Sequence, residues 1–316
     1  MNNNIKPVKA LIEIPSWLGD FVMSTPSIEN IINHYQDIEI TIIGSSAPIE
    51  AIKNHPKVVR TMVLDKRYKS LYKACNQLGE FDIYFTFRSS FRAKFLKFFI
   101  KAKKKYQYNN IYQDCHQVEK YNKFINDSLN ANFKAGTLSL PVEIVRKNNK
   151  SRTVGINPGA SYGNAKRWYP KEFGKVAEEL SKTYNIIIFG NSNEVQFALE
   201  IEKLLVSKGV ENYINLSGKT SISELIKSIS KLDLFITGDS GPMHIAACFK
   251  IPTVALFGPT NDLETSQWLN KRKIIIKKNL ACQPCLKRIC PLGHHNCMKL
   301  IDAKEVIDAI KKNNFL

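Results

Sequence analysis

Apolar residues along this chain recur in short continuous runs, separated by polar turns and by longer stretches with helical spacing. The first run covers residues 10–14 and is followed by the turn PSWLGD, after which residues 21–35 carry apolar side chains at helical spacing. Continuous apolar runs bounded by turn residues are typical of strands that are buried on both faces. Their alternation with helices predicts parallel βαβ units, and so an α/β fold.

The alternation continues through both halves of the chain. The further strands that we predict cover residues 38–44, 61–64, 81–85, 153–157, 185–189, 234–237 and 252–257, with a strand-like run that ends at 215–219. Helices fall between them, and the clearest cover residues 171–184 and 194 to about 208. Each half of the chain is therefore predicted to be a βαβ array.

A polar, basic run, RKNNKSR, separates the two arrays, and a length of 316 residues suits two domains. We place a first domain at residues 1–148 and a second at 149–302. Residues 303–316 have the pattern of an amphipathic helix, which we expect to pack back on the first domain. We expect the ligand site in the cleft between two such domains.

The stretch at 237–260, TGDSGPMHIAACFKIPTVALFGPT, is the unit around which the second array is organised. Its GDSGP turn joins the carboxyl end of a strand to the amino end of a helix, where open α/β sheets bind phosphate-bearing ligands. Gly238 and Gly241 let the backbone approach a ligand closely. Asp239 and Ser240 either contact that ligand or cap the helix, and the turn alone leaves both open. The same two interpretations apply to Asp20, which opens the first helix.

The formal net charge of +18 indicates an acidic partner, such as nucleic acid, an anionic membrane face or a phosphorylated substrate. The first residues, MNNNIKPVKALIEIP, are too polar for a secretory signal or a membrane span, and no other window has an apolar run of spanning length. We therefore expect a soluble, cytoplasmic protein. Seven cysteines, an odd number, then indicate reduced thiols rather than a disulfide framework.

Residues 88–105, RSSFRAKFLKFFIKAKKK, hold eight Lys or Arg residues and no acid, interleaved with four phenylalanines. One interpretation is a helix with an apolar face on the core and a basic face in solvent. The alternatives are a membrane-surface patch or a site that binds the phosphates of an acceptor. The high overall charge favours contact with an anion.

The tail of the second domain has the spacing Cys282-x2-Cys285-x4-Cys290-x6-Cys297, with His294 and His295 beside the last cysteine. Zinc sites use four thiolate or imidazole ligands, and this segment has more than four. However, the spacing is not that of a clean pair of zinc knuckles. A compact surface loop that happens to contain cysteines is the alternative.

Four blocks together resemble the ADP-heptose:lipopolysaccharide heptosyltransferases, glycosyltransferase family nine, and most of all their heptosyltransferase II branch. The blocks are SWLGDFVMSTP, NPGASYGNAKRWYP, TGDSGPMHIAA with LFGPTN, and CQPCLKRICPLGHHNCM. The resemblance covers residues 9–298, and only residues 66–150, where an acceptor would dock, match poorly. It implies the GT-B architecture, two facing Rossmann-like domains with the active site in the cleft between them.

The resemblance also implies a reaction: inverting transfer of L-glycero-D-manno-heptose from ADP-heptose to the first heptose of the lipopolysaccharide inner core, heptosyl-Kdo2-lipid A. The second domain would hold the donor and the first domain the acceptor. Asp20 matches the family's catalytic base, and Lys166 matches its donor-phosphate lysine. The other positions that match donor-binding residues are Glu194, Asp239, Ser240, Gly241 and His244.

The chemistry agrees with these roles. One carboxylate takes the proton of the acceptor hydroxyl as the oxygen attacks. The charge on the leaving ADP can be stabilised by helix N–H groups and one lysine, and the chain has no D-x-D triplet of the kind that holds a metal beside a diphosphate. We therefore expect no metal and no cofactor, with ADP-heptose as the donor substrate.

The basic segment then has a function in this interpretation. Arg88, Arg92 and Lys94 are candidates for binding the carboxylates or phosphates of an acidic acceptor, and the phenylalanines for resting on the inner membrane, with which the protein would associate peripherally from the cytoplasm. A related transferase with another donor or acceptor is one alternative. A basic, zinc-containing nucleic-acid-binding protein is the other, but no recognised nucleic-acid motif is present.

Overall fold

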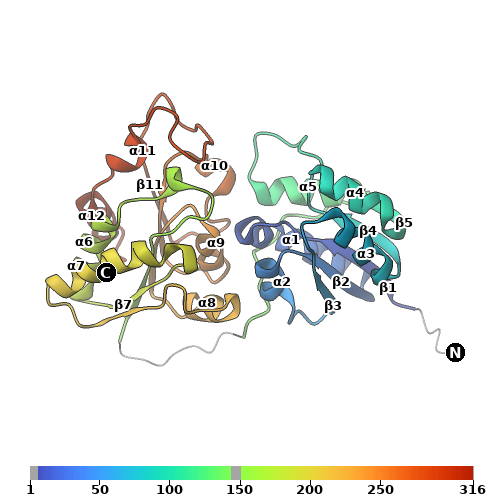
Figure 1. The fold of residues 1–316 in the computed structure, drawn as a ribbon, viewed down its shortest axis with the longest axis horizontal. Helices are drawn as coiled ribbons and strands as arrows, with labels where there is room; N and C mark the ends of the chain where they lie inside the picture. The colour runs from blue at the N-terminus through green and yellow to red at the C-terminus, as the bar shows by residue number, and fades with distance from the viewer. Residues whose placement is uncertain (1–5, 144–150, 316) are drawn as a thin grey trace. The chain divides into compact units, whose positions relative to one another are not determined.

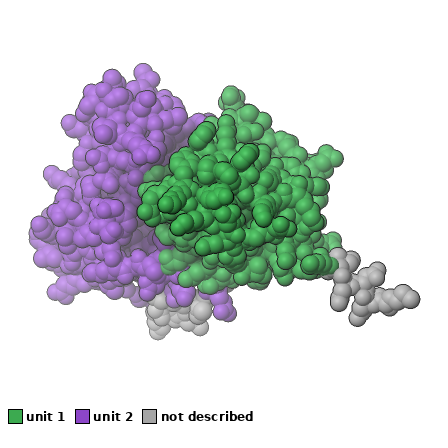
Figure 2. Space-filling view, turned by 45° about the vertical axis from the view of Figure 1, so that its right-hand side comes forward, with its two compact units in different colours: residues 1–142 green, residues 143–316 purple. Residues whose placement is uncertain are grey.

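The computed structural model of the chain describes residues 6–143 and 151–315. The chain forms two compact units, residues 1–142 and 143–316 (Figure 2). The predicted domain boundary at 148 and 149, and most of the RKNNKSR run, lie outside the described residues.

The first unit is built on a wholly parallel sheet of five strands in the order β3-β2-β1-β4-β5 (Figure 1). Its strands are β1 (Val8–Glu13), β2 (Ile38–Gly44), β3 (Val58–Val63), β4 (Glu80–Thr86) and β5 (Lys101–Gln107). Its helices are α1 (Leu18–Tyr35), α2 (Ser46–Ile52), α3 (Tyr68–Leu78), α4 (Phe91–Phe99) and α5 (Gln117–Leu129). The direction of strand order reverses between β1 and β4, and loops at such a switch point form the binding crevice of open α/β sheets.

The four strands predicted in the first half are confirmed, but the strand β5 was missed. Its sequence, KAKKKYQ, contains only exposed and partly buried residues and is not an apolar run. It lies at the edge of the sheet, where lysines are common because they prevent unwanted strand pairing. An edge strand of this kind has no strong hydrophobic signal.

The basic segment at 88–105 therefore is not one helix. The helix α4 ends at Phe99, and only Ala93 and Leu96 on it are buried. Phe91 and Phe98 are 75% and 77% exposed. The interpretation that turned the phenylalanines toward the core is wrong for these two residues, because the helix buries its smaller apolar side chains instead.

The second unit has a parallel sheet of six strands in the order β11-β10-β9-β6-β7-β8. Its strands are β6 (Thr153–Asn157), β7 (Asn185–Ile188), β8 (Tyr213–Asn215), β9 (Leu234–Gly238), β10 (Thr253–Phe257) and β11 (Lys273–Lys277). Its helices are η1 (Asn164–Lys166), α6 (Pro170–Ser181), η2 (Ser192–Glu194), α7 (Val195–Ser207), α8 (Ile222–Ile229), α9 (Gly241–Cys248), α10 (Asp262–Thr265), α11 (Asn296–Lys299) and α12 (Ala303–Lys312). The strand order reverses between β6 and β9, which gives this unit its own switch point.

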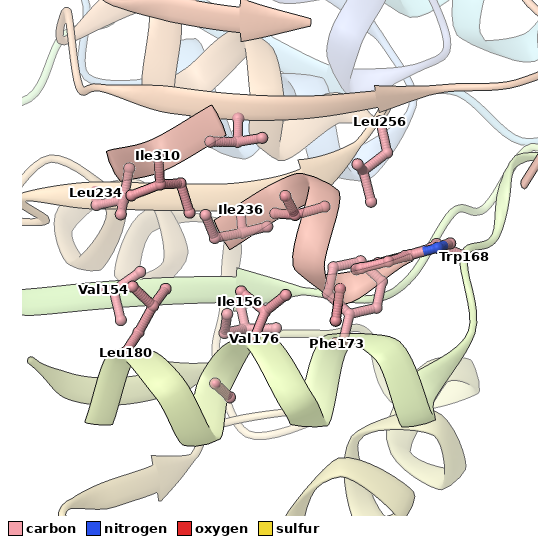
Figure 3. Packing of buried hydrophobic residues seen from close by; sticks show 14 of the residues in the cluster. Val154, Ile156, Trp168, Phe173, Val176, Leu180, Leu234, Ile236, Leu256 and Ile310 are labelled. Atoms are coloured by element: carbon pink, nitrogen blue, oxygen red, sulfur yellow. The ribbon is translucent and has the colours of Figure 1, made fainter. Parts of the chain in front are cut away.

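The core of the second unit lies between its sheet and the helix α6 (Figure 3). Phe173, Val176 and Leu180 of α6 point at the sheet, where Val154 and Ile156 of β6 meet them. Their spacing of three and four residues places them on one face of the helix. This packing fixes β6, and with it the loop that follows β6, in place.

The last helix, α12, belongs to the second unit. Val306 and Ile310 are fully buried in the core of that unit, and Lys311 forms an ion pair with Glu179 of α6 at 3.0 Å. We expected this helix to pack on the first domain, and the structure corrects that prediction. The amphipathic pattern identifies the face that is buried, but it carries no information about the partner.

No helix among residues 6–143 and 151–315 has the length and apolar character that crossing a membrane requires.

Candidate functional site

The switch point of the second unit is lined by the polar ends of β6 and β9, which are neighbours in the sheet. Asn157, the last residue of β6, donates from Nδ2 to Thr237 Oγ1 at 3.2 Å and to Ser240 Oγ at 3.3 Å. This side chain is 3% exposed, so these bonds tie the two loops together inside the protein. Asn157 opens the motif NPGASYGNAKRWYP, but no role was predicted for it. A polar residue at the end of an apolar strand was the available signal.

The amino end of α9 faces the same loops and has no side-chain cap. Ser240 occupies the capping position without bonding a backbone N–H group of the helix. Its hydroxyl lies 3.1 Å from Thr237 Oγ1 instead. Neither the Ser240 nor the Asp239 side chain therefore caps this helix. Of the two interpretations of the turn, contact with a ligand is the one that remains. The N–H groups of a first helical turn without a side-chain cap are suited to an anion.

Asp239 forms a nearly buried ion pair with Lys166. The Nζ atom of Lys166 lies 2.6 Å from Asp239 Oδ2, and the two side chains are only 12% and 5% exposed. Thr260, which follows β10, donates to the same carboxylate oxygen at 2.6 Å. The structure thus brings together two residues predicted from separate motifs, at the edge of the sheet where the amino end of α9 lies.

The loop that carries Lys166 is held by the cysteine-rich tail. The amide N–H of Ala165 donates to the carbonyl of Arg288 at 3.0 Å. His295 lies 2.9 Å from the carbonyl of Ala165 through Nε2 and 3.1 Å from the Tyr169 hydroxyl through Nδ1. Lys166 itself lies over the ring of Tyr162, 4.8 Å from its centroid. The tail therefore supports the lysine, and both ring nitrogens of His295 are engaged in this contact.

The four cysteines of the tail line one small cavity of about 20 Å³. Burial raises the pKa of the Cys297 thiol, and the nearby thiols of Cys282, Cys285 and Cys290 raise it further. Backbone N–H groups, that of His295 first, lower the pKa of Cys290. Within the part of the chain that the structure describes, no three His, Cys, Asp or Glu side chains are arranged to hold a metal ion.

Glu194 follows β7 and is 4% exposed. Its carboxylate accepts the N–H of Asn191 at 2.9 Å, as part of a capping box for η2. Gly159 lies so close that an added Cβ atom would stand 2.0 Å from the carboxyl carbon of Glu194. Burial raises the pKa of this carboxyl above its ordinary value. The loop after β6 thus packs directly on Glu194, and the close approach requires the glycine.

The remaining predicted residues of this unit lie in α9. Gly241 is the first residue of the helix, and His244, in its first turn, is 3% exposed.

In the first unit, Asp20 lies in the first turn of α1, after the switch-point strand β1. The capping position belongs to Trp17, and Asp20 is the third residue of the helix. The aspartate is near Tyr121 and Tyr108 of the same unit. Burial is the main cause that raises the pKa of Tyr121 well above its ordinary value, and the charge of Asp20 raises it further. A carboxylate in the first turn is stabilised by the helix dipole.

A buried carboxylate that sequence reasoning missed holds Arg88 at the same switch point. Glu13, the last residue of β1, is fully buried and accepts from the Tyr84 hydroxyl at 2.9 Å and from Thr86 Oγ1 at 2.7 Å. Its other oxygen lies 3.2 Å from a terminal nitrogen of Arg88. The signal was visible: a charged residue in an otherwise apolar strand is almost never fully buried without a partner.

Arg88 has a second guanidinium beside it. Burial lowers the pKa of Arg92, and the charge of Arg88 lowers it further. The Nε atom of Arg92 is buried and has no hydrogen-bond partner among the described residues. Lys94 is exposed on α4. The structure thus brings Arg88 and Arg92 together into a pair with excess positive charge, a suitable place for an anion.

Two Rossmann-like units, each a parallel sheet with polar groups gathered at its switch point, are the architecture of the GT-B glycosyltransferases. The chain matches glycosyltransferase family 9 (heptosyltransferase) over residues 71–296. It is 39% identical, over 98% of its length, to the whole of a lipooligosaccharide heptosyltransferase 2 from Campylobacter jejuni.

The fold agrees with solved structures. ADP-heptose lps heptosyltransferase II of E. coli superposes with a TM-score of 0.78, at 21% identity, over 96% of this chain and 98% of that one. E. coli heptosyltransferase WaaC with ADP gives a TM-score of 0.78 at 14% identity, over 96% and 99% of the two chains.

The chain belongs to glycosyltransferase family 9, and the predicted family, α/β GT-B fold and enzyme class are confirmed. It is a heptosyltransferase of lipopolysaccharide or lipooligosaccharide core biosynthesis. The alternative of a nucleic-acid-binding protein loses its basis. The individual site roles and the predicted location of the site in an interdomain cleft stay predictions.

Proposed function

We propose that the protein transfers L-glycero-D-manno-heptose from ADP-heptose to the first heptose of the lipopolysaccharide inner core, heptosyl-Kdo2-lipid A, with inversion at the anomeric carbon. The observation that carries the proposal is the Lys166–Asp239 ion pair beside the uncapped amino end of α9. Such a site suits a sugar nucleotide, because it combines a cation and helix N–H groups for a diphosphate with a carboxylate for sugar hydroxyls.

The second unit would hold the donor. In this proposal the diphosphate lies at the amino end of α9 on the N–H of Gly241, with Ser240 and His244 beside it, and Lys166 supplies the positive charge. Asp239 contacts the sugar and Glu194 the ribose. Charge that develops on the leaving ADP is stabilised by groups that are already fixed in place, so the transfer needs no metal ion. The relatives support the donor class, since the name of one of them contains ADP-heptose.

The first unit would hold the acceptor, with Asp20 as the general base. Inversion requires that the acceptor oxygen attack the anomeric carbon from the face opposite the leaving diphosphate. As the new carbon–oxygen bond forms, Asp20 takes the hydroxyl proton and the carbon–oxygen bond to ADP breaks. The position of Asp20 at the switch point of the first unit supports this role.

Arg88 and Arg92 would bind a carboxylate or phosphate of the acceptor, with Lys94 further out. We expect Arg92→Glu to raise the KM for the acceptor by roughly ten- to a hundredfold, the worth of one charged hydrogen bond. The KM for ADP-heptose should not change. Arg88→Gln should act in the same direction, and it avoids placing a second carboxylate next to Glu13.

Initial rates at varied acceptor concentration test this prediction. Arg60→Gln is the matched control, since Arg60 is an exposed arginine of the same unit that bonds only the carbonyl of Gln77 among the contacts described. An acceptor KM that is the same in Arg92→Glu, Arg88→Gln and the control would remove the arginine pair from the acceptor site.

The acceptor is lipid-linked, so we propose that the enzyme works at the cytoplasmic face of the inner membrane as a peripheral protein. The second candidate is a family 9 transferase with a different sugar or acceptor. A transferase of this kind would use the same site. The residues proposed to contact the sugar and the diphosphate lie next to each other, and they do not identify which sugar is bound.

The experiment that tests the proposal is ADP release by the purified protein with ADP-heptose and heptosyl-Kdo2-lipid A in the presence of EDTA. We expect release that depends on the acceptor. If EDTA abolishes release and magnesium or zinc restores it, the metal-free account of the leaving group is wrong. If no release occurs under either condition, the donor or acceptor is wrong, and competition by other nucleotide sugars identifies the second candidate.

A further inference from the structure

The outer side of α3 and α4 in the first unit carries a continuous row of aromatic rings. The two helices lie side by side (Figure 1), and Tyr68 and Tyr72 of α3 meet Phe95 and Phe99 of α4 edge to face at 5.0 and 5.1 Å. Phe98 extends the row, with its ring 5.0 Å from that of Phe99. We call these five residues the aromatic strip.

Much of the aromatic strip is exposed. Tyr68 and Tyr72 are 47% and 46% exposed, and Phe98 is 77% exposed. The buried side of these helices consists mainly of other residues, such as Leu71 and Leu96, and Phe95 and Phe99 are partly buried against the same core. Tyr68, Tyr72 and Phe98 therefore form the exposed part of the strip, and adjoining exposed aromatic rings mark an interaction surface.

Basic residues surround the aromatic strip. The helices α3 and α4 contain no acidic residue. The lysines on them and on the adjoining ends are Lys66, Lys69, Lys73, Lys94, Lys97 and Lys101. Protection of the sheet edge explains lysines on β5, but it does not explain exposed aromatic rings on the helices beside them.

We propose that the aromatic strip and its lysines dock the first unit on an anionic lipid surface. Aromatic side chains favour the interface of a bilayer, and each nearby lysine is attracted by acidic head groups. The charge complementarity selects this partner, since an acidic bilayer meets both the lysines and the rings. The proposal adds a defined surface to the peripheral association proposed above. Of the residues named for this surface, only Lys94 is also a candidate for the acceptor site.

Sedimentation with lipid vesicles tests the docking surface. The full chain is mixed with vesicles of phosphatidylcholine alone or of equal parts phosphatidylcholine and phosphatidylglycerol. The variant Lys69→Glu/Lys73→Glu/Phe98→Ser changes two exposed lysines and one exposed ring of this surface. The control Lys203→Glu/Lys231→Glu/Val206→Ser makes the same charge change and also removes one exposed apolar side chain, all in the second unit.

We expect the native chain and the control to bind the acidic vesicles and to be released by salt, with little binding to phosphatidylcholine. The surface variant should bind at least roughly a hundredfold more weakly, because it loses the attraction of two lysines and gains two repulsive charges. Circular dichroism checks that it folds. Equal binding by the variant and the control, or no binding by the native chain, overturns the proposal.

Two further readouts separate this proposal from others. If the native chain is a dimer without vesicles and the surface variant a monomer, the strip binds a second copy of the chain and the lipid proposal is wrong. ADP release is measured in parallel with the acceptor dispersed in detergent. Turnover without vesicle binding overturns only the docking surface, whereas vesicle binding without turnover contradicts only the proposed reaction.

Discussion

Replacing Asp20 by alanine should lower kcat by roughly two to four orders of magnitude, the range for the loss of a general base. The reason is chemical: an acceptor hydroxyl is a poor nucleophile until its proton is removed, and Asp20 is the carboxylate proposed to remove it. Asp20→Asn should lose a similar factor, because the amide keeps the shape and cannot accept the proton. Initial rates of ADP release at saturating substrates measure the effect.

The fold should survive this substitution. Asp20 lies in the first turn of α1, where the interaction of a carboxylate with the helix dipole stabilises the fold by about 0.3–1 kcal/mol. Loss of this dipole interaction alone lowers the free energy of unfolding by about 0.3–1 kcal/mol, and urea unfolding measures the total change. Donor binding, measured by calorimetry with ADP, should not change, because the proposed donor residues all lie in the second unit.

Asp37→Ala is the matched control. Asp37 is an exposed aspartate just beyond the other end of the same helix, where the dipole gives a carboxylate no stabilisation. It should keep the native rate. Near-native turnover by Asp20→Ala would show that another group takes the proton, and the assignment of Asp20 would be withdrawn.

The sequence predicts which residues lie at the switch points more readily than it predicts the partners of those residues. Asp20 and Asp239 could be identified because each occupies a glycine-containing turn between an apolar strand and a helix. That local pattern places a polar side chain at the carboxyl edge of a parallel sheet without knowledge of the rest of the fold. The pairing of Asp239 with Lys166 needed the structure, since 73 residues separate them along the chain.

Glu13 illustrates what the pattern hides. It lies within the apolar run at residues 10–14, which predicts only a buried strand. Its partners Tyr84 and Thr86 come from a strand about seventy residues later, so the local pattern does not reveal them. The aromatic strip shows the same limit on a helix. Hydrophobicity suggested that the phenylalanines of α4 face the core. The helix instead buries Ala93 and Leu96. Phe95 and Phe99 pack only partly against that core, and Phe91 and Phe98 are exposed. The predicted packing partner of α12 was wrong for a related reason, because an amphipathic pattern shows which face of a helix is buried but not which element covers it.

Lys166→Met should lower both the rate and the stability of the enzyme, and the two effects can be separated. The rate should fall by roughly a hundred- to a thousandfold, as when one preorganised charge is removed from a leaving group. The free energy of unfolding should fall by about 3 kcal/mol, because the nearly buried carboxylate of Asp239 loses its cation and, among the described residues, keeps only the hydroxyl of Thr260 as a side-chain partner. ADP release and urea unfolding measure the two quantities.

The double variant Lys166→Met/Asp239→Leu distinguishes a catalytic lysine from a structural one. Replacing both members of a buried ion pair by apolar side chains removes the unpaired charge, so most of the lost stability should return. The rate should stay low, since neither the phosphate cation nor the proposed sugar contact is restored. Lys175→Met is the control: Lys175 pairs with Glu172 at the same distance of 2.6 Å but is 45% exposed, and its removal should cost less than about 1 kcal/mol and no activity. If the double variant regains its rate together with its stability, the ion pair serves the fold alone, and the cation that meets the diphosphate must be sought elsewhere in the second unit.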